Sequence, residues 1–346
     1  MRDAAARATL PPQSGVDASV LCVAVLGTGS IGMRHLSVLR GIEGVRPLAV
    51  PVRPQRVAEL SSAGMAAADG LEAAARLGAT RCIVATETRR HVEDGLAALA
   101  HGMDLLVEKP LGVSAPEAAR LRARAREAGR TLAVGCVLRF SESLNWLREE
   151  LPRLGRLHSV RIECQSHLPA WRAGRPYQES YSARAEDGGV LRDLIHEIDY
   201  AGWIFGWPEA VFARVKNIGR LRIDAEELVE LSWELEGGAL LSLCLDYLST
   251  PPRRRISACG EQGAIEWDGI AGAVTIAHGG EPARERRASQ TREAMFHAQA
   301  EAFLQAARGL PMGQLAGADD GVNALAVCDA ARRSAASRRE ETVEYP

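Results

Sequence analysis

A short apolar run that ends in a glycine-rich loop constrains the fold of this chain more than any other feature. Residues 21–26 read LCVAVL, the loop follows at residues 27–32, and a helical pattern begins at residue 33. Small residues in such a loop let the chain turn tightly, and they let backbone N–H groups approach a pyrophosphate at the start of the helix. A purely structural turn is the alternative, but strand, loop and helix come in the order that dinucleotide binding requires. We therefore predict a dinucleotide site formed by Gly27, Thr28, Gly29, Ser30, Ile31 and Gly32.

The apolar runs before and after about residue 139 follow two different rhythms. A chain of 346 residues exceeds the usual size of one domain, so two compact units are expected. In the first unit short strands alternate with longer helical stretches, which is typical of a parallel sheet covered by helices. In the second unit strand-like runs follow one another, with hairpin signals at Gly237-Gly238 and at 261–263. The strands predicted for the first unit are 21–26, 47–52, 82–85, 104–107 and 131–134.

These rhythms predict the domain organisation. We expect an α/β N-terminal Rossmann domain, with a doubly wound parallel sheet, at residues 20–138. An α+β C-terminal domain with a largely antiparallel open sheet is predicted at residues 139–346, for substrate binding and oligomerisation, and residues 1–19 are predicted to be a mobile N-terminal tail. An open sheet needs cover on its second face, which helices of the same chain or another subunit can supply. We expect a homodimer or homotetramer that forms through the C-terminal sheet.

Composition excludes several classes of protein. The 42 Lys and Arg residues and the 44 Asp and Glu residues are interspersed, so no basic stripe indicates a nucleic-acid partner. No run approaches the roughly 20 apolar residues of a membrane span. Seven cysteines are scattered singly, without a CxxC pair or an apolar leader, which indicates buried thiols in the cytoplasm. No metal is expected either, because the nearest His and Cys pair, Cys164 and His167, would lie on opposite faces of a strand.

The residues after the second predicted strand bear on the choice of cofactor. An acidic residue about 20 positions beyond the glycine loop usually receives the ribose hydroxyls of NAD. This chain has none there, and its nearest charged residues are Arg53 and Arg56. Guanidinium groups form strong charge-assisted bonds with a 2′-phosphate, so the sequence favours NADP over NAD, with Arg53 as a cofactor ligand. The alternative is that both are surface arginines of an Arg-rich chain.

One lysine stands out in a chain that otherwise uses arginine. Only Lys109 and Lys216 are lysines among the 42 basic residues. A lysine can shift its pKa enough to transfer a proton, whereas a guanidinium stays protonated. Lys109 follows the fourth predicted strand, at the sheet edge where ligands bind, and Pro110 restricts it to extended conformations. We predict a functional role for Lys109; an exposed loop lysine is the alternative.

Five motifs, in order along the chain, resemble the glucose-fructose oxidoreductase, inositol dehydrogenase and MocA (Gfo/Idh/MocA) family. They are the glycine loop, Ala85-Thr86-Glu87-Thr88 with His91, Glu108-Lys109-Pro110, Arg139-Phe140, and residues 188–199, which read GGVLRDLIHEID. The resemblance implies that the cofactor lies over the first domain and that Lys109 contacts both nicotinamide and substrate. It also implies that Asp193 and His196 complete the catalytic site and that Arg139 contacts the substrate. The residues implied to line the cofactor groove are Ala85, Thr86, Glu87, His91, Glu108 and Lys109.

The last motif departs from the family pattern. The family commonly places the His four residues after the Asp with a Gly between, but here His196 is three residues after Asp193. A shift of one residue rotates a side chain by about 100° around a helix, so Glu197 is an alternative proton-transfer group on the helix predicted over residues 189–205. We favour His196, because it titrates near neutral pH and shares a helix face with Asp193 and with Asp199, which could orient it. A histidine with a purely structural role is the remaining alternative.

An irregular stretch before this helix is rich in aromatic and arginine side chains. Residues 168–181 read LPAWRAGRPYQESY. Aromatic faces suit a sugar ring and arginines suit a carboxylate or phosphate, so we predict a polyhydroxylated ligand, either neutral or acidic. The stretch resembles a branch of the family associated with bacterial surface-sugar biosynthesis; an interdomain packing loop is the alternative. The substrate residues predicted here are Trp171, Arg172, Tyr177 and Tyr181.

These features together predict an NAD(P)-dependent dehydrogenase or reductase acting on the CH–OH group of a sugar or sugar derivative. His196, or Lys109 acting with it, would take the hydroxyl proton while the hydride passes to the nicotinamide. Asp193 would hold the substrate. Two alternatives remain open: a non-catalytic NADP-binding regulator, and a lyase or hydrolase that uses tightly bound NAD transiently.

Overall fold

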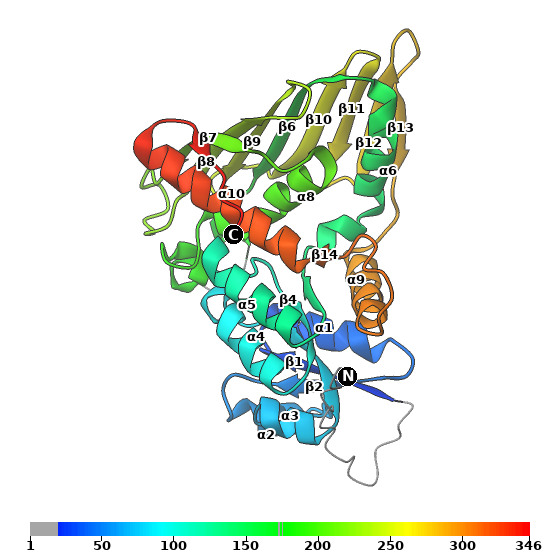
Figure 1. The fold of residues 1–346 in the computed structure, drawn as a ribbon, viewed down its shortest axis with the longest axis vertical. Helices are drawn as coiled ribbons and strands as arrows, with labels where there is room; N and C mark the ends of the chain where they lie inside the picture. The colour runs from blue at the N-terminus through cyan, green and yellow to red at the C-terminus, as the bar shows by residue number, and fades with distance from the viewer. Residues whose placement is uncertain (1–19, 172–173, 175) are drawn as a thin grey trace, which may run out of the picture.

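Two sheets organise the molecule. The computed structural model describes residues 20–171, 174 and 176–346, so the tail predicted at 1–19 and the predicted substrate residue Arg172 lie outside the described residues. One sheet has six strands in the order β14-β5-β4-β3-β1-β2, and the other has nine in the order β13-β12-β11-β10-β6-β9-β8-β7-β15. Figure 1 shows the first sheet with its helices at one end of the molecule and the second sheet at the other.

The first sheet is the predicted parallel one. Its strands β1 to β5 pair in parallel, and a short strand near the end of the chain, β14 (Ala316–Gly317), adds antiparallel to β5. Alternate residues of β1 serve different cores, since Val23 and Val25 pack on one face and Ala24 on the other. The prediction of a doubly wound parallel sheet is confirmed. The parallel strands are β1 (Leu21–Leu26), β2 (Val45–Val50), β3 (Ala79–Val84), β4 (Asp104–Val107) and β5 (Leu132–Val134).

Helices cover both faces of this sheet. Helix α1 packs with α9 (Arg292–Ala306) on one face, and α4 and α5 pack with α10 (Ala318–Ser337) on the other. Helix α9 therefore returns from the far end of the sequence to lie beside α1 (Figure 1). The remaining helices here are α1 (Ser30–Arg40), α2 (Arg56–Ser62), α3 (Leu71–Arg76), α4 (His91–Ala100) and α5 (Ala115–Glu127).

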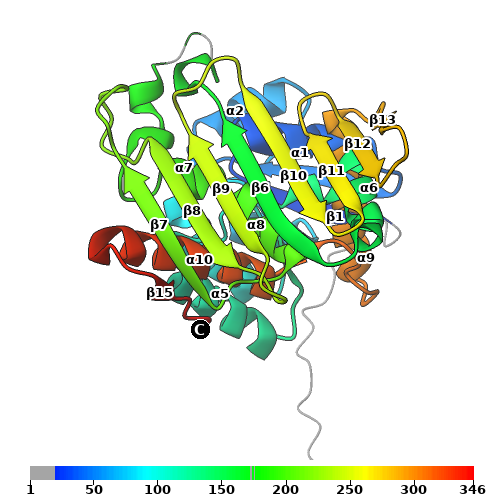
Figure 2. The ribbon, with the colours of Figure 1, turned by 90° about the horizontal axis from the view of Figure 1, so that it is seen from above.

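The second sheet is largely antiparallel, as predicted. Only β6 and β9 pair in parallel among its described strands. One face packs on α6 (Glu142–Glu150), α8 and α10, and the other lies open toward the viewer in Figure 2. Along β6 the buried residues Val160 and Ile162 alternate with Arg161 and Glu163 on the open face. The strands are β6 (Leu157–Gln165), β7 (Ala210–Lys216), β8 (Leu228–Glu234), β9 (Leu240–Asp246), β10 (Arg253–Gly260), β11 (Gly263–Asp268), β12 (Ala273–His278), β13 (Arg284–Arg287) and β15 (Glu341–Thr342).

The helix predicted over residues 189–205 is broken. Helix α7 (Val190–Asp193) ends at Leu194, whose φ of −96° and ψ of 29° are not helical, and α8 (Ile195–Phe205) starts afresh. The break lies between the two predicted catalytic residues, where the family pattern has one residue more. It therefore resets the relative orientation of Asp193 and His196, which an unbroken helix would have fixed.

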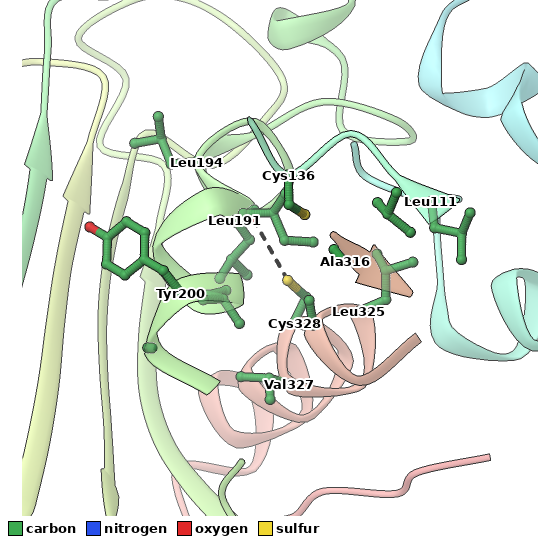
Figure 3. Close-up of a cluster of buried hydrophobic side chains, with 14 of the residues drawn as sticks. Leu111, Cys136, Leu191, Leu194, Tyr200, Ala316, Leu325, Val327 and Cys328 are labelled. Atoms are coloured by element: carbon green, nitrogen blue, oxygen red, sulfur yellow. Dashed lines mark hydrogen bonds between the residues drawn. The ribbon is translucent and has the colours of Figure 1, made fainter. Parts of the chain in front are cut away.

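A shared apolar core holds this broken segment in place. Figure 3 shows Leu191 beside Cys136 and beside Cys328 of α10, in the same buried cluster as Leu194 and as Leu111, which follows the fourth strand. The thiol of Cys328 on α10 lies 3.6 Å from the backbone oxygen of Leu191. The core thus ties the α7–α8 junction to the segment that carries Lys109.

Two further findings concern membrane-spanning helices and the state of the cysteines. In the described part of the chain, no helix combines the length and apolarity that crossing a membrane demands. All seven cysteines are free; five are buried, and Cys244 and Cys259 are only half-buried, since they lie on the open face of the second sheet.

Candidate active site

The glycine loop has the geometry of a phosphate-binding turn. Gly27 has a φ of 95°, and a Cβ there would lie 2.6 Å from the backbone oxygen of Ala85. A Cβ on Gly32 would lie 1.8 Å from the backbone oxygen of Gly27, so both positions need glycine. Gly29, the N-cap of α1, faces open space and no side chain caps the helix start. The first N–H groups of α1 are thus left for a ligand, and a pyrophosphate fits that position.

Arginines follow β2 where NAD-binding proteins usually carry an acid. The residue 20 positions after Gly32 is Val52, which is exposed. Arg53 is exposed, and Arg56 donates to the backbone oxygen of Thr28 in the glycine loop over 2.8 Å. Arg56 therefore ties the start of α2 to the loop, and Arg53 keeps its guanidinium in solvent.

The residues after β3, which were predicted to line the cofactor groove, make contacts with neighbouring segments of the protein. Thr86 donates through its hydroxyl to Asp94 over 2.7 Å, and Glu87 is exposed and pairs with Arg184 of the second domain over 3.1 Å. His91, predicted to line the groove, is instead buried: Nδ1 lies 2.7 Å from the oxygen of Pro110 and Nε2 lies 3.2 Å from the oxygen of Thr86. Burial lowers the pKa of His91, so it is a neutral link between the segments after β3 and β4.

The lysine motif rests on a buried histidine that sequence reasoning missed. His35 of α1 is fully buried and donates from Nε2 to the Glu108 carboxylate over 2.7 Å, while the other Glu108 oxygen accepts from the backbone N–H of Lys109. Burial alone would raise the pKa of Glu108, but the bond from His35 and the charges of His35 and Lys109 lower it. Glu108 thus connects the glycine-loop helix to the backbone of Lys109. The only sequence signal for this contact is the polar residue on the buried face of α1.

Lys109, Asp193 and Tyr247 form one chain of hydrogen bonds. The ammonium of Lys109 donates to the backbone oxygen of Asp193 over 2.6 Å. The hydroxyl of Tyr247 donates to Oδ2 of Asp193 over 2.6 Å, and burial together with that carboxylate raises the pKa of Tyr247, so it remains a donor. The other carboxylate oxygen, Oδ1, is buried and has no partner among the described residues. Asp193 therefore retains one acceptor for a ligand. Tyr247, directly after β9, is a further residue that the sequence did not reveal.

His196 is a neutral imidazole with unused hydrogen-bonding capacity. Its ring is half-buried, and Nδ1 has no partner among the described residues. Burial lowers its pKa well below the ordinary value, and the positive charges of Lys109, Arg254 and Arg292 lower it further. The structure thus brings Lys109, Asp193 and His196 together at the carboxyl edge of the first sheet, in spite of the altered spacing.

Two neighbours on α8 have structural roles instead of the ones predicted. Glu197, the alternative proton-transfer group, is completely buried and accepts from Arg254 of β10 over 2.8 Å. Asp199, predicted to orient His196, is bonded through both oxygens to Arg139 over 2.7 and 3.0 Å. In each case the carboxylate is hydrogen-bonded to an arginine and not to the imidazole of His196.

Arg139 is accordingly not placed to contact a substrate. It is buried, and besides Asp199 it pairs with Asp320 of α10 over 3.1 Å. A buried arginine needs such partners, because an unpaired charge is costly away from water. Arg139 holds α8 and α10 together beneath the site.

The aromatic stretch contributes one residue near the site. The ring of Trp171 meets the ring of Tyr247 edge-on, with centroids 5.3 Å apart, and its indole N–H donates to Ser166. The hydroxyl of Tyr177 donates to the backbone oxygen of Leu221 over 3.1 Å, so this residue serves loop packing. Tyr181 is half-buried and contributes to the electrostatic surroundings of Tyr247. Among the described residues no group of three His, Cys, Asp or Glu side chains could hold a metal ion.

Comparison with known proteins supports this picture. A family model described as "Oxidoreductase family, NAD-binding Rossmann fold" matches residues 21–136, and one described as "GFO/IDH/MocA C-terminal domain" matches residues 151–266. Myo-inositol dehydrogenase Hyg17 of Streptomyces leeuwenhoekii is 29% identical over 92% of this chain and 98% of its own length. Rhizopine catabolism protein MocA of Rhizobium meliloti is 31% identical over 72% of this chain and 74% of its own.

Solved structures share the fold. An inositol dehydrogenase homologue from Azotobacter vinelandii, solved with NADH and myo-inositol, superposes with a TM-score of 0.81 over 94% of this chain and 98% of its own, at 16% identity. The match spans both sheets, so the two-domain architecture is the one found in that structure.

Proposed function

This chain belongs to the Gfo/Idh/MocA family of NAD(P)-binding oxidoreductases, and on that basis we propose that it oxidises a secondary alcohol on a sugar or cyclitol derivative, reversibly. The observation that carries the proposal is the hydrogen-bonded chain of Lys109, Asp193 and Tyr247 beside a neutral His196. Inositol dehydrogenases among its relatives favour this substrate class. The narrower assignment to surface-sugar biosynthesis remains a prediction.

The chain's own residues suit a nicotinamide dinucleotide. The glycine positions leave the start of α1 open for a pyrophosphate. Lys109 lies at the same carboxyl edge of the sheet, where ligands bind in such folds. When bound, the nicotinamide ring supplies the acceptor for a hydride. We further propose that NADP is preferred over NAD, because Arg53 is exposed after β2 and no carboxylate stands at Val52 to receive ribose hydroxyls.

The proton has a defined route in this proposal. Oxidation of the alcohol to a ketone removes one hydride and one proton, and His196 would accept the hydroxyl proton while a bound nicotinamide would take up the hydride. Lys109 stabilises the negative charge that develops on the alcohol oxygen. The free oxygen of Asp193 accepts a hydrogen bond from a substrate hydroxyl, and Tyr247 fixes the carboxylate for that task. The low pKa of His196 keeps the imidazole neutral, and therefore able to accept a proton, at pH 7.

Turnover with a panel of polyols tests the proposal. Purified protein is mixed with NADP or NAD and with inositols, hexoses and sugar acids, and reduction is followed by nicotinamide absorbance. Net reduction that disappears in Lys109→Met supports a dehydrogenase. Product formation without net reduction would instead indicate a lyase or hydrolase that uses the cofactor transiently, and cofactor binding without any product would indicate a regulator.

We also propose that the open face of the second sheet joins subunits. This face is polar and carries both signs of charge around a hollow, which suits a self-complementary interface about a twofold axis. Sedimentation velocity tests this: we expect a dimer or tetramer in which Arg161→Glu weakens association, and a monomeric wild type would refute it. The hollow is lined by Arg161, Glu163, Arg255, Glu266, Asp268 and Arg287, among others.

A further inference from the structure

Three arginines from three different elements gather around the proposed site. The guanidinium carbons of Arg34 on α1 and Arg292 at the start of α9 lie 5.2 and 5.8 Å from the centroid of the same ring, that of Phe296. This ring lies 5.4 Å from the ring of His35, whose partner Glu108 directly precedes Lys109. The third, Arg254 on β10, bonds to Glu197, the neighbour of His196.

The start of α9 is fixed at this place. Gln290, just before the helix, donates to the backbone oxygen of Phe140 over 3.0 Å and accepts from the backbone N–H of Glu142 over 2.8 Å. These residues follow β5, so the anchor lies beyond the carboxyl end of the parallel strand next to β4. Arg292 is therefore held near the sheet edge at which ligands bind in such folds.

Arg292 has an unfavourable electrostatic position that the charges of Glu293 and Glu108 relieve only in part. It occupies the first position of a 15-residue helix, where the helix dipole is positive and acidic residues are preferred. Burial lowers its pKa, and the charges of Arg34 and Arg254 lower it further. It forms no ion pair with any described carboxylate. Of the three arginines, only Arg254 has a carboxylate within hydrogen-bonding distance, since Glu197 lies 2.8 Å from it. The nearest carboxylate to Arg34, that of Glu293, is 4.0 Å away.

Arg254 also keeps part of its guanidinium available. Its Nε donates to Glu197, which is completely buried, whereas the Arg254 side chain is 27% exposed. The positive charges of Arg254, Arg292 and Lys109 all act on His196. Next to them, Oδ1 of Asp193 and Nδ1 of His196 are buried without partners. The site thus offers polar groups for hydroxyls and, near them, two arginines, of which Arg254 is paired with Glu197 and Arg292 has no ion pair with a described carboxylate.

We propose that Arg292 and Arg254 bind an anionic group on the substrate, so that this enzyme acts on a sugar acid or sugar phosphate rather than a neutral or amino sugar. This inference rests on the proposed function, because His196 and Lys109 act on a hydroxyl of the same ligand. A carboxylate or phosphate between the two guanidinium groups forms charge-assisted hydrogen bonds and relieves the repulsion between them.

Binding of matched sugars tests this without requiring turnover. D-glucuronate, D-glucose and D-glucosamine are similar in size but differ in charge, and D-glucose 6-phosphate distinguishes phosphate from carboxylate. Titrated by calorimetry into protein saturated with NADPH, an anionic sugar should bind most tightly and glucosamine most weakly. Arg292→Gln should weaken the anionic sugar about tenfold or more and change glucose less than about twofold. Arg124→Gln on the exposed surface of α5 removes the same charge elsewhere and serves as the control.

Several outcomes overturn the proposal. The anion site is refuted if glucuronate and glucose 6-phosphate both bind no more tightly than glucose. It is also refuted if Arg292→Gln weakens the binding of glucose and of glucuronate equally. A loss confined to NADPH affinity assigns Arg292 to the cofactor and refutes it as well. Arg292→Lys, which retains a charge, should recover part of the affinity, and thermal unfolding of each variant separates binding from folding. Tight anion binding without nicotinamide reduction would leave this inference standing while the proposed dehydrogenase activity fails.

Discussion

The α7–α8 junction and the first turns of α8 each carry a buried aspartate, but the two aspartates differ in how many of their oxygens are hydrogen-bonded. At the junction Asp193 uses one oxygen for Tyr247 and leaves the other free, and His196 leaves Nδ1 free. One turn further on, Asp199 engages both oxygens with Arg139. All three residues lie within seven positions of the chain. At the junction the free acceptors belong to the groups proposed to react, whereas the saturated ion pair of Asp199 and Arg139 holds α8 in place.

Replacement of Lys109 gives the largest expected effect on the junction side of this comparison. Lys109→Met keeps the length of the side chain and removes its ammonium, so stabilisation of the alcohol oxygen is lost. We expect kcat/KM to fall about 10²- to 10⁴-fold, with the melting temperature nearly unchanged. Steady-state kinetics with the best substrate of the polyol panel measure this. Retention of near-normal activity would remove Lys109 from the chemistry.

Replacement of Asp199 should have the reverse profile. Asp199→Ala leaves the buried Arg139 with Asp320 alone, and breaking a buried ion pair costs about 3 kcal/mol of unfolding free energy. Urea titration should show this loss, while kcat of the folded protein stays within about threefold of wild type, since no step of the reaction needs this carboxylate. If Asp193→Ala destabilises the protein as much as Asp199→Ala, the contrast between the two sites is wrong.

Removal of one hydroxyl tests whether Tyr247 acts through Asp193. Tyr247→Phe keeps the ring against Trp171 and deletes the bond to Oδ2, so the carboxylate becomes free to rotate. A hydrogen bond to a charged group is worth about 1.5–3 kcal/mol, and we expect kcat/KM to fall about ten- to hundredfold. If Tyr247 positions Asp193, the loss should appear mainly in kcat for any substrate. Tyr345→Phe, which deletes a hydroxyl bonded to the backbone of Pro208, should leave kinetics unchanged.

Local signals were sufficient to predict the dinucleotide-binding fold. The glycine loop and Lys109 depend on neighbours in sequence, because a tight turn or a strand end requires particular residues at that point. The parallel, helix-covered character of the first sheet followed from the alternation of short apolar runs and helices. The broken helix at Leu194 was missed, since helical periodicity over residues 189–205 contains no signal for a single non-helical residue.

Contacts between distant segments were beyond local reasoning. His35 meets Glu108 across 73 residues, Tyr247 meets Asp193 across 54, and Arg139 meets Asp199 across 60. Which polar side chains pair across such distances is decided by how the sheets and helices pack, so Asp199 and Arg139 received functional roles that belong to structure. Helix α9, which carries Arg292, follows the last predicted strand in the sequence, and no element was predicted there.

The smallest expected effect concerns the pH dependence of stability at the junction. The pKa of His196 is lowered well below the 6.5 of an unfolded histidine, so the unfolded chain binds a proton that the folded protein excludes as the pH drops below about 6.5. Stability therefore falls on acidification in that range, by at most about 1.4 kcal/mol per pH unit from this group. His196→Asn removes the contribution, and its unfolding free energy should fall less steeply than that of wild type between about pH 6.5 and 5. The buried His91 has a lowered pKa too and is present in both proteins, so the difference between their slopes isolates His196. Identical slopes would mean that the pKa of His196 is the same in the folded and the unfolded chain, so that burial and the neighbouring cations are not what keeps its imidazole neutral at the junction.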